Sequence, residues 1–254
     1  MELELAGKTA LVTGGSKGIG FGIADRLAAE GCLLSIVARD AAGLEAARVR
    51  LTQGHGRAVV AHAADVGDTR QLAGVFPLLE GLDILVNCAG AVPRGGLLDV
   101  SAERFRSAFN AKVMGTIDLC REALRAMGAR GSGVIVNIIG LSGERPNPRS
   151  VATSAANAAL IAFTQAVGSE SVDRNVRVVG INPGLIATGR TAGISDPKNT
   201  LDNAAYRHLM STLPFGRMGE AVEVADLAAF LASPRAGYIS GAVFTVDGGS
   251  RFRV

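Results

Sequence analysis

Thr13-Gly14-Gly15-Ser16-Lys17-Gly18-Ile19-Gly20 lies between an apolar run over residues 8–12 and a run with helical periodicity over residues 19–30. A strand that turns through glycines into a helix lets backbone N–H groups and the positive end of the helix dipole approach a phosphate, because no Cβ blocks the way. The same spacing also occurs in plain strand-to-helix corners, so the assignment depends on the rest of the chain. The turn predicts that a dinucleotide is bound by Gly14, Ser16, Lys17, Gly18, Ile19 and Gly20.

Short apolar runs alternate with helix-length segments along the whole chain. The runs cover residues 9–12, 33–37, 58–62, 84–87, 134–139, 176–181 and 243–246. Helix-length connections require crossovers, so the strands must be parallel. The pattern predicts one α/β domain over residues 1–254, a Rossmann-like, doubly wound, seven-stranded parallel sheet with helices on both faces. Ligands of such sheets bind at the carboxyl ends of the strands.

The composition excludes several classes of protein. The chain has 254 residues, 48% of them hydrophobic, and 26 basic residues balance 23 acidic ones to a net charge of +3. A hydrophobic fraction of this size argues against disorder, and the dispersed charges argue against a nucleic-acid partner. Cys32, Cys88 and Cys120 have no metal-binding spacing, so we expect reduced core thiols and no metal site.

The N-terminus and the hydropathy pattern bear on location. Acidic residues at positions 2 and 4 do not fit a signal peptide, and we identify no apolar run of membrane-spanning length. We therefore expect a cytoplasmic protein with no membrane partner. The connection over residues 189–219 is unusually long and follows a strand end, so we expect a substrate lid there, with a passive loop as the alternative.

Several segments, in order, resemble motifs of the classical short-chain dehydrogenase/reductase (SDR) family. The glycine turn resembles TGxxxGIG, Asp65-Val66 resembles an adenine-contacting pair, and Asn87-Cys88-Ala89-Gly90 is similar to NNAG with one asparagine replaced. Asn182-Pro183-Gly184 with Thr188 is similar to NPGxxxT, and Val246-Asp247-Gly248-Gly249 to VDGG. The resemblance implies hydride transfer between a nicotinamide cofactor and a carbonyl or alcohol. It implies further cofactor contacts at Asp65, Val66, Asn87, Ala89, Gly90, Pro183, Gly184, Ile186 and Thr188.

Family members also pair through two long helices, which here correspond to residues 102–127 and 151–172. The resemblance therefore implies a homodimer or a homotetramer. The Ala-rich second helix suits close helix packing.

The charge at the end of the second strand indicates the cofactor. A carboxylate there would accept both ribose hydroxyls of NAD(H) and repel a 2′-phosphate. Here the strand ends in Arg39, whose planar guanidinium suits a phosphate, and Lys17 adds a second cation. NADP(H) is favoured. In the alternative, Arg39 is solvated and Asp40 binds the ribose of NAD(H).

The catalytic positions depart from the family pattern. Family members use a serine, a tyrosine and, four residues after the tyrosine, a lysine that favours the phenolate. Alignment puts Gly140, Thr153 and Asn157 at these three positions, and no Tyr-x-x-x-Lys occurs anywhere in the chain. A threonine hydroxyl is a far weaker acid than a phenol, and asparagine carries no charge. Asn157 can still hydrogen-bond the nicotinamide ribose.

Other groups are candidates for the missing roles. Asn110 falls at the family's active-site asparagine, where its expected role here is to maintain a distortion of the helix. Ser142, two residues beyond the serine position, is a possible substitute, as are Ser150 and Ser154. His208, with Tyr206 and Arg207, lies in the expected lid and can act as a replacement acid, with a solvated helix as the alternative.

Two functions remain open from the sequence. The first is an NADP(H)-dependent oxidoreductase with a degenerate active site, acting on a small-molecule carbonyl or alcohol. The second is a catalytically inactive NADP(H)-binding protein that serves as a sensor or an assembly partner.

Overall fold

A seven-stranded parallel sheet forms the centre of the protein. The computed structural model describes residues 2–90, 92–191 and 211–253. The strands lie in the order β3-β2-β1-β4-β5-β6-β9. Their bounds are β1 Thr9–Thr13, β2 Leu33–Ala38, β3 Val60–Ala63, β4 Ile84–Asn87, β5 Gly133–Ile138, β6 Val176–Pro183 and β9 Val243–Val246. The predicted fold is confirmed, and only the third strand starts noticeably later than expected.

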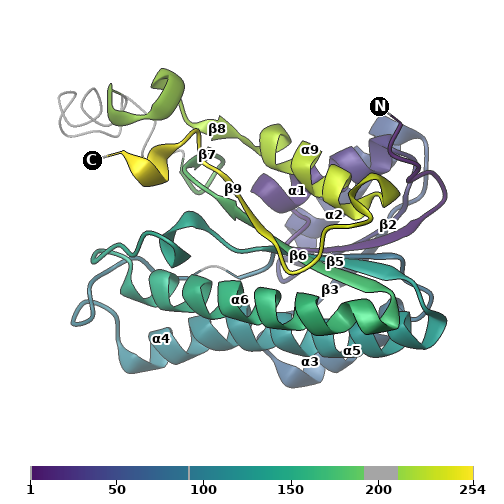
Figure 1. The fold of residues 1–254 in the computed structure, drawn as a ribbon, viewed down its shortest axis with the longest axis horizontal. Coiled ribbons are helices and arrows are strands. Elements are labelled where there is room, and N and C mark those ends of the chain that lie inside the picture. The colour runs from purple at the N-terminus through teal and green to yellow at the C-terminus, as the bar shows by residue number, and fades with distance from the viewer. Residues whose placement is uncertain (1, 91, 192–210, 254) are drawn as a thin grey trace.

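Helices cover both faces of the sheet (Figure 1). One layer contains α1 (Gly18–Ala29), α2 (Ala41–His55) and α9 (Ala221–Ala232). The opposite layer contains α3 (Thr69–Ala73), α4 (Ala102–Phe109), α5 (Gly115–Arg130) and α6 (Val151–Glu170). Each layer has its own buried core, one around Ile23, Leu27 and Val224, the other around Leu119 and Met127. Because both faces of the central strands are buried, these strands consist of short, continuous runs of hydrophobic residues.

The strand order places a crevice beside the glycine turn. β1 pairs with β2 on one side and with β4 on the other, so the chain direction across the sheet reverses at β1. Loops at the carboxyl ends of β1 and β4 then separate toward opposite helix layers and leave room for a ligand. The turn that begins at Gly14 opens into this crevice.

The segment predicted as one helix over residues 102–127 is interrupted. α4 ends at Phe109, a π-helical turn covers Asn110–Met114, and α5 then continues to Arg130. A Cβ at Gly115 would lie 2.4 Å from the carbonyl oxygen of Val66, so the helix passes against the loop after β3. The π turn changes which residues face inward, because it holds an extra residue per turn.

The expectation of no apolar run of membrane-spanning length was wrong for α6. Within residues 151–174, an 18-residue window has a mean hydropathy of 1.2, and by length and composition alone the segment suffices to cross a membrane. In the fold this helix packs against the sheet, where Ala156 and Leu160 form a buried cluster with Val113 and Ile139. Packing inside the protein uses 39% of that window.

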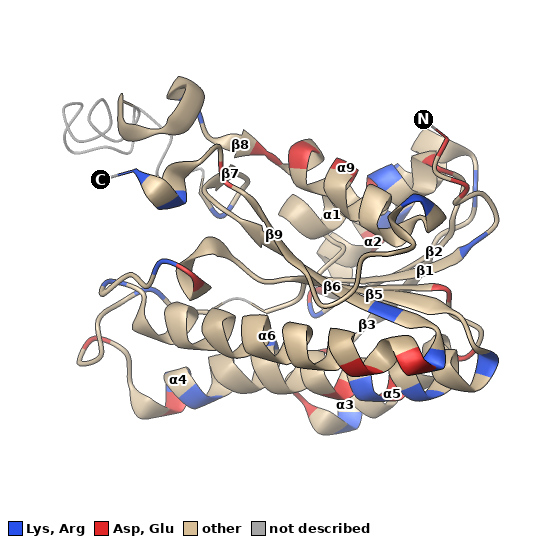
Figure 2. Ribbon diagram, in the orientation of Figure 1, with Lys and Arg blue, Asp and Glu red and all other residues tan. Residues whose placement is uncertain are grey.

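Charges are spread over the outer helices in mixed pairs (Figure 2). Arg48 pairs with Glu45 on α2, and Arg121 with Asp118 on α5. α6, by contrast, carries a single charged residue, Glu170, at its C-terminal end.

A second, two-stranded sheet was not predicted. β7 (Ile186–Ala187) pairs with β8 (Gly219–Glu220) beside the C-terminal end of the chain (Figure 1). Most of the expected lid lies between these strands. Residues 192–210, which include Tyr206, Arg207 and His208, lie outside the described residues.

Candidate active site

The glycine turn is fixed by close backbone packing. Gly14 has φ +70°, and a Cβ there would lie 3.0 Å from the backbone of Cys88. A Cβ at Gly20 would lie 2.2 Å from the carbonyl oxygen of Gly14, so α1 can approach the strand only with glycine at this position. Lys17 precedes α1 in an extended conformation, and no side chain caps the helix. The uncapped amides and the helix dipole together suit an anion.

A large pocket surrounds this turn. Its volume is about 640 Å³, and twelve predicted cofactor residues line it: Gly14, Ser16, Lys17, Gly18, Ile19, Gly20, Arg39, Asp65, Val66, Ala89, Gly90 and Thr188. Residues that were not assigned to the cofactor complete the wall: Val37, Ala38, Asp40, Ala64, Cys88, Ala111, Gly189 and Arg190. The glycine backbone, the uncapped helix and the cations Lys17 and Arg39 fit the phosphates of a dinucleotide.

The end of the pocket at β2 and β3 carries opposite charges. Nη1 of Arg39 lies 3.6 Å from Oδ2 of Asp65, and the side chain of Arg39 is 63% exposed. Asp65 also accepts a hydrogen bond of 2.9 Å from the amide of Gly67. The exposed guanidinium is therefore held near the pocket by a weak ion pair and stays free to contact a phosphate. Asp40, the alternative ribose ligand, lines the same end.

The three degenerate catalytic positions have unequal surroundings. Gly140 has φ +141°, and a Cβ there would lie 2.7 Å from Nδ2 of Asn157. Nδ2 of Asn157 donates a hydrogen bond of 2.8 Å to Oγ of Ser142, whereas Oδ1 has no partner among the described residues. Asn157 is only 2% exposed. The structure thus joins Gly140, Ser142 and Asn157 in one cluster, beside which Thr153 is half-buried.

A polar network fixes the turn after β5. The amide of Gly140 donates to Oδ1 of Asn182, and Nδ2 of Asn182 donates over 2.7 Å to Oε1 of Glu144. Glu144 also accepts from Thr245 and pairs with Arg251. Burial acts to raise the pKa of Glu144, but hydrogen bonds from Arg251, Asn182 and Thr245 outweigh it and lower that pKa. Strands β6 and β9 therefore help to position Gly140.

Asn110 is exposed at the start of the π turn, which agrees with its expected place at a helix distortion. Its assignment to the family's active-site asparagine stays a prediction. Lys112 is the side chain of this turn that reaches the end of β5. It is 8% exposed, and its Nζ donates a hydrogen bond of 2.7 Å to the carbonyl oxygen of Ile139.

The ionisation of Lys112 is shifted by its surroundings. Burial lowers its pKa to about 8, Cys88 acts in the opposite direction, and Arg190 adds to the lowering. Sequence reasoning missed this residue, although one signal was available. The chain has four lysines, and this one lies among the apolar residues of Ala111-Lys112-Val113-Met114.

Several other predicted cofactor residues are not among those that line the large pocket. Asn87 is buried, and its side-chain amide donates a hydrogen bond of 3.0 Å to Oδ1 of Asn137. Ile186 lies in β7, which pairs with β8, and it lines the smaller cavity. Pro183 ends β6, and the amide of Gly184 bonds the carbonyl of Val246 on β9, so neither lines the pocket.

Of the other two candidate serines, Ser154 has a structural partner for its hydroxyl. Oγ of Ser154 accepts a hydrogen bond of 3.0 Å from the amide of Asn147, and the backbone of Ser150 forms a bridge with Gly95. Both residues therefore help to hold the loop before α6.

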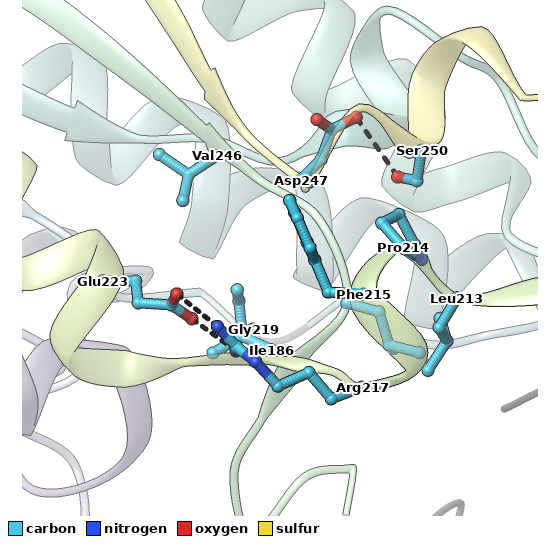
Figure 3. A pocket seen from close by; sticks show the side chains of 12 residues that line it. Ile186, Leu213, Pro214, Phe215, Arg217, Gly219, Glu223, Val246, Asp247 and Ser250 are labelled. Carbon is cyan, nitrogen blue, oxygen red and sulfur yellow. Dashed lines mark hydrogen bonds and ion pairs between the residues drawn. The ribbon is translucent and has the colours of Figure 1, made fainter.

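A smaller cavity lies between the second sheet and the C-terminal segment (Figure 3). Its volume is about 80 Å³, and Ile186, Pro214, Phe215 and Val246 contribute to its wall. Arg217 and Glu223 form a two-pronged ion pair at one side, with N–O distances of 2.8 and 2.9 Å. A cavity of this size is too small for a nucleotide.

Cys32 and Cys120 are buried, and Cys88 is half-buried. No disulfide joins Cys32, Cys88 and Cys120, and burial is the largest cause that raises the pKa of each thiol to about 12. Within residues 2–90, 92–191 and 211–253, no group of histidine, cysteine and acidic residues forms a metal site.

Comparisons with known proteins agree with this geometry. A family model described as enoyl-(acyl carrier protein) reductase matches residues 14–251. The 3-oxoacyl-(acyl-carrier-protein) reductase of Chlamydia trachomatis is 34% identical over 96% of this chain and 98% of its own length. The NADPH-dependent reductase BacG of Bacillus subtilis is 34% identical over 96% of this chain and 97% of its own.

A solved structure extends the agreement to three dimensions. L-sorbose reductase from Gluconobacter frateurii, in complex with NADPH and L-sorbose, has a TM-score of 0.92 and 29% identity and covers 100% of both chains. The glycine turn, the strand order and these relatives lead to one conclusion: the chain belongs to the short-chain dehydrogenase/reductase family.

Proposed function

We propose that this protein is an NADP(H)-dependent oxidoreductase that interconverts a carbonyl and an alcohol on a small molecule. The observation that carries the proposal is the single pocket in which the glycine turn, Lys17 and Arg39 lie together. The cofactor, when bound, supplies or accepts the hydride. The protein's part is to bind and orient it, to exclude water and to move a proton.

The preference for NADP(H) over NAD(H) is argued from charge. Arg39 offers a planar guanidinium suited to a phosphate, and its pairing with Asp65 is long and exposed, at 3.6 Å. Two relatives carry the same cofactor in their names, BacG as an NADPH-dependent reductase and L-sorbose reductase as a complex with NADPH. Asp40 remains close enough to contact a ribose, so the preference rests on Arg39.

The proposal includes a degenerate proton relay. Gly140, Thr153 and Asn157 occupy the positions at which the family pattern expects serine, tyrosine and lysine. Oγ of Ser142 accepts the hydrogen bond from Asn157, so its O–H remains the group that can orient a substrate oxygen. The loss of a positioned general acid removes about two to four orders of magnitude in rate, unless another group replaces it.

A specific observation also favours a second function, a catalytically inactive NADP(H)-binding protein. Twelve of the predicted cofactor residues line one pocket, whereas none of the three relay positions carries an ionisable side chain. Such a protein would bind NADPH and serve as a sensor or an assembly partner.

Assembly, location and lid belong to the proposal. α6 exposes small uncharged residues such as Ala155, Ala158 and Ala162, which supports a homodimer or homotetramer paired through this helix (Figure 2). Three unpaired thiols, two of them buried, support a cytoplasmic location. Gly189 and Arg190 line the pocket, which supports a substrate lid that starts at residue 189.

The decisive experiment separates the two functions. NADPH binding is measured by calorimetry, and NADPH oxidation is followed with a panel of ethyl acetoacetate, L-sorbose and simple aldehydes. The enzyme predicts oxidation above background, with formation of the matching alcohol. NADPH binding with no oxidation on the panel favours the second function, and absence of NADPH binding contradicts both.

Gly18→Val, which adds a branched side chain at φ +58° facing Thr188 in the pocket, should abolish binding.

A further inference from the structure

Three segments of the chain meet around the side chain of Lys112. Its backbone lies in the π turn Asn110–Met114. Its stem packs on the turn after β4, since a Cβ at Gly90 would lie 2.8 Å from Cβ of Lys112. Its Nζ reaches the carbonyl oxygen of Ile139, the residue before Gly140. Lys112 therefore runs from the wall of the dinucleotide pocket to the position of the missing serine.

The ammonium group of Lys112 is poorly compensated. It has three N–H donors, and among the described residues one hydrogen bond is formed, to Ile139. No acidic side chain pairs with it in the described part of the chain, and the titratable groups that act on it are Cys88 and Arg190. Beside it, Val113, Ile139 and Ala156 form an apolar cluster. A buried, unpaired ammonium costs stability, so its position calls for a functional explanation.

An unused acceptor lies at the same peptide. Gly140 follows Ile139, and a Cβ at Gly140 would lie 2.7 Å from Nδ2 of Asn157, so the missing side chain makes room for this amide. Oδ1 of that amide is buried without a partner among the described residues. If the amide is turned over, Nδ2 is left without a partner instead, so one polar atom of Asn157 stays available. Lys112, bonded to Ile139, and Asn157, packed on Gly140, therefore lie at two successive residues of the same turn.

We propose that Lys112 is the proton donor of the reduction, in place of the tyrosine and lysine that the chain lacks; this rests on the proposed reductase function. As the carbonyl carbon accepts the hydride from the reduced cofactor, the C=O electron pair moves to oxygen. An N–H bond of Lys112 breaks, and an O–H bond forms. The carbonyl is reduced to the alcohol, the cofactor is oxidised, and the neutral amine regains a proton from water. In the direction of oxidation, the neutral amine accepts the hydroxyl proton.

The ionisation of Lys112 suits this role. Its pKa of about 8 leaves it mostly protonated at neutral pH and close to the working range of a general acid. An ordinary lysine near 10.5 would be a weaker donor. The reduction rate should therefore fall as pH rises through about 8, and the oxidation rate should rise.

The first test locates and titrates the side chain without turnover. The protein is produced with isotope-labelled lysine, and the four side-chain signals are followed by NMR from pH 6 to 11 in roughly half-unit steps. Lys112→Gln assigns the signal of Lys112, and Lys8→Gln, at an exposed lysine, is the matched control. We expect the Lys112 signal to titrate near pH 8 and to move on addition of NADP⁺ but not of adenosine 2′,5′-diphosphate, which lacks the nicotinamide. A pKa near 10.5, or no response to NADP⁺, overturns the proposal.

The second test measures catalysis. A glutamine side chain can still donate a hydrogen bond to the carbonyl oxygen of Ile139, but it cannot transfer a proton. Lys112→Gln therefore tests the loss of proton transfer while the hydrogen bond is kept. We expect NADPH affinity to change by less than about threefold and kcat to fall on the order of 100-fold, with loss of the pH dependence near 8. If the Lys112→Gln variant folds poorly, Lys112→Met serves as the second variant.

The outcomes distinguish the role of Lys112 from the reductase function itself. If the wild type is active and Lys112→Gln has the same rate and pH profile, Lys112 is not the proton donor, and the reductase function still holds. NADPH binding without reduction of any carbonyl contradicts the reductase and removes the reaction that Lys112 would serve. Absence of NADPH binding contradicts the cofactor assignment itself.

Discussion

Gly140 shows why the missing serine is not restored by a single substitution. Its backbone has φ +141°, which L side chains rarely adopt, and a Cβ would lie 2.7 Å from Nδ2 of Asn157. We expect Gly140→Ser to lower the free energy of unfolding by about 1–3 kcal/mol and not to create activity. Denaturant unfolding measures the loss. In an Asn157→Ala background the steric part of the cost should disappear and the backbone part should remain; an unchanged stability of Gly140→Ser would contradict this account.

Lys112 gives a prediction on stability that is independent of catalysis. Its folded pKa of about 8 lies below the ordinary value of 10.5. Between these two pH values the unfolded chain binds more protons, so stability should rise with pH across this window and be flat below it. At pH 7, Lys112→Met should stabilise the protein by about 2 kcal/mol, because about 3 kcal/mol of ionisation cost is removed and about 1 kcal/mol of hydrogen bond is lost.

Denaturant unfolding between pH 7 and 10 tests that prediction. The wild type should gain stability as pH rises above 8, whereas Lys112→Met should not share this gain. Lys8→Met, which removes an exposed lysine, should behave like the wild type. A Lys112→Met variant less stable than the wild type at pH 7 would show that the ammonium is well compensated.

Among the elements, the π turn that starts at Asn110 interrupts a helix that was expected to be continuous. A continuous helix over residues 102–127 was the natural expectation, since its apolar periodicity extends through the turn. The turn holds an extra residue. Side chains after it therefore point to a different side of the helix than they would in a regular α-helix. The cause lies in tertiary packing, at Gly115 against Val66 and at Gly90 against Lys112. Neither contact is visible in the periodicity of one segment.

Gly90 connects the π turn to the pocket. It has φ +116°, and a Cβ there would lie 2.8 Å from Cβ and 2.9 Å from Cα of Lys112. We expect Gly90→Ala to destabilise the protein by about 1–3 kcal/mol and to weaken NADPH binding by roughly tenfold, because the pocket wall must shift. Calorimetry and thermal unfolding measure both effects.

Gly54→Ala is the matched control for Gly90→Ala. Gly54 lies in α2, and a Cβ there would meet nothing within 4 Å. The free energy of unfolding of Gly54→Ala should be about 0.5–1 kcal/mol higher than that of the wild type, because alanine has the higher helix propensity, and NADPH binding should be unchanged. Equal effects of the two variants would mean that contact with Lys112 does not govern the Gly90 position.

At the scale of the whole molecule, most of the fold followed from local patterns. Alternating apolar runs and helix-length connections allow little besides a parallel, doubly wound sheet, and the sheet has the predicted seven strands. The turn from Thr13 to Gly20 supplies six of the twenty residues that line the large pocket, so a short local motif indicates where the pocket lies. The short pair β7 and β8 was missed, because two-residue strands leave no periodicity.

The reaction end was harder to predict because it is assembled from distant segments. Residues 90, 112, 139 and 157 meet there through the sheet and two helices. Ser142 could be predicted as a replacement because it is close in sequence to the position of the missing serine, and the structure places it beside Asn157. Lys112 could not be predicted in this way, because it lies 45 residues before Asn157 in the chain.

We infer that the large pocket binds a dinucleotide whose 2′-phosphate contacts Arg39. Calorimetric titration of wild type and Arg39→Ala with NADPH and NADH tests it most directly. A charged hydrogen bond contributes about 1.5–3 kcal/mol, so the wild type should bind NADPH about 10- to 100-fold more tightly than NADH. Arg39→Ala should lose this preference through weaker NADPH binding alone. Equal or tighter binding of NADH by the wild type, or an unchanged preference in Arg39→Ala, would contradict the account.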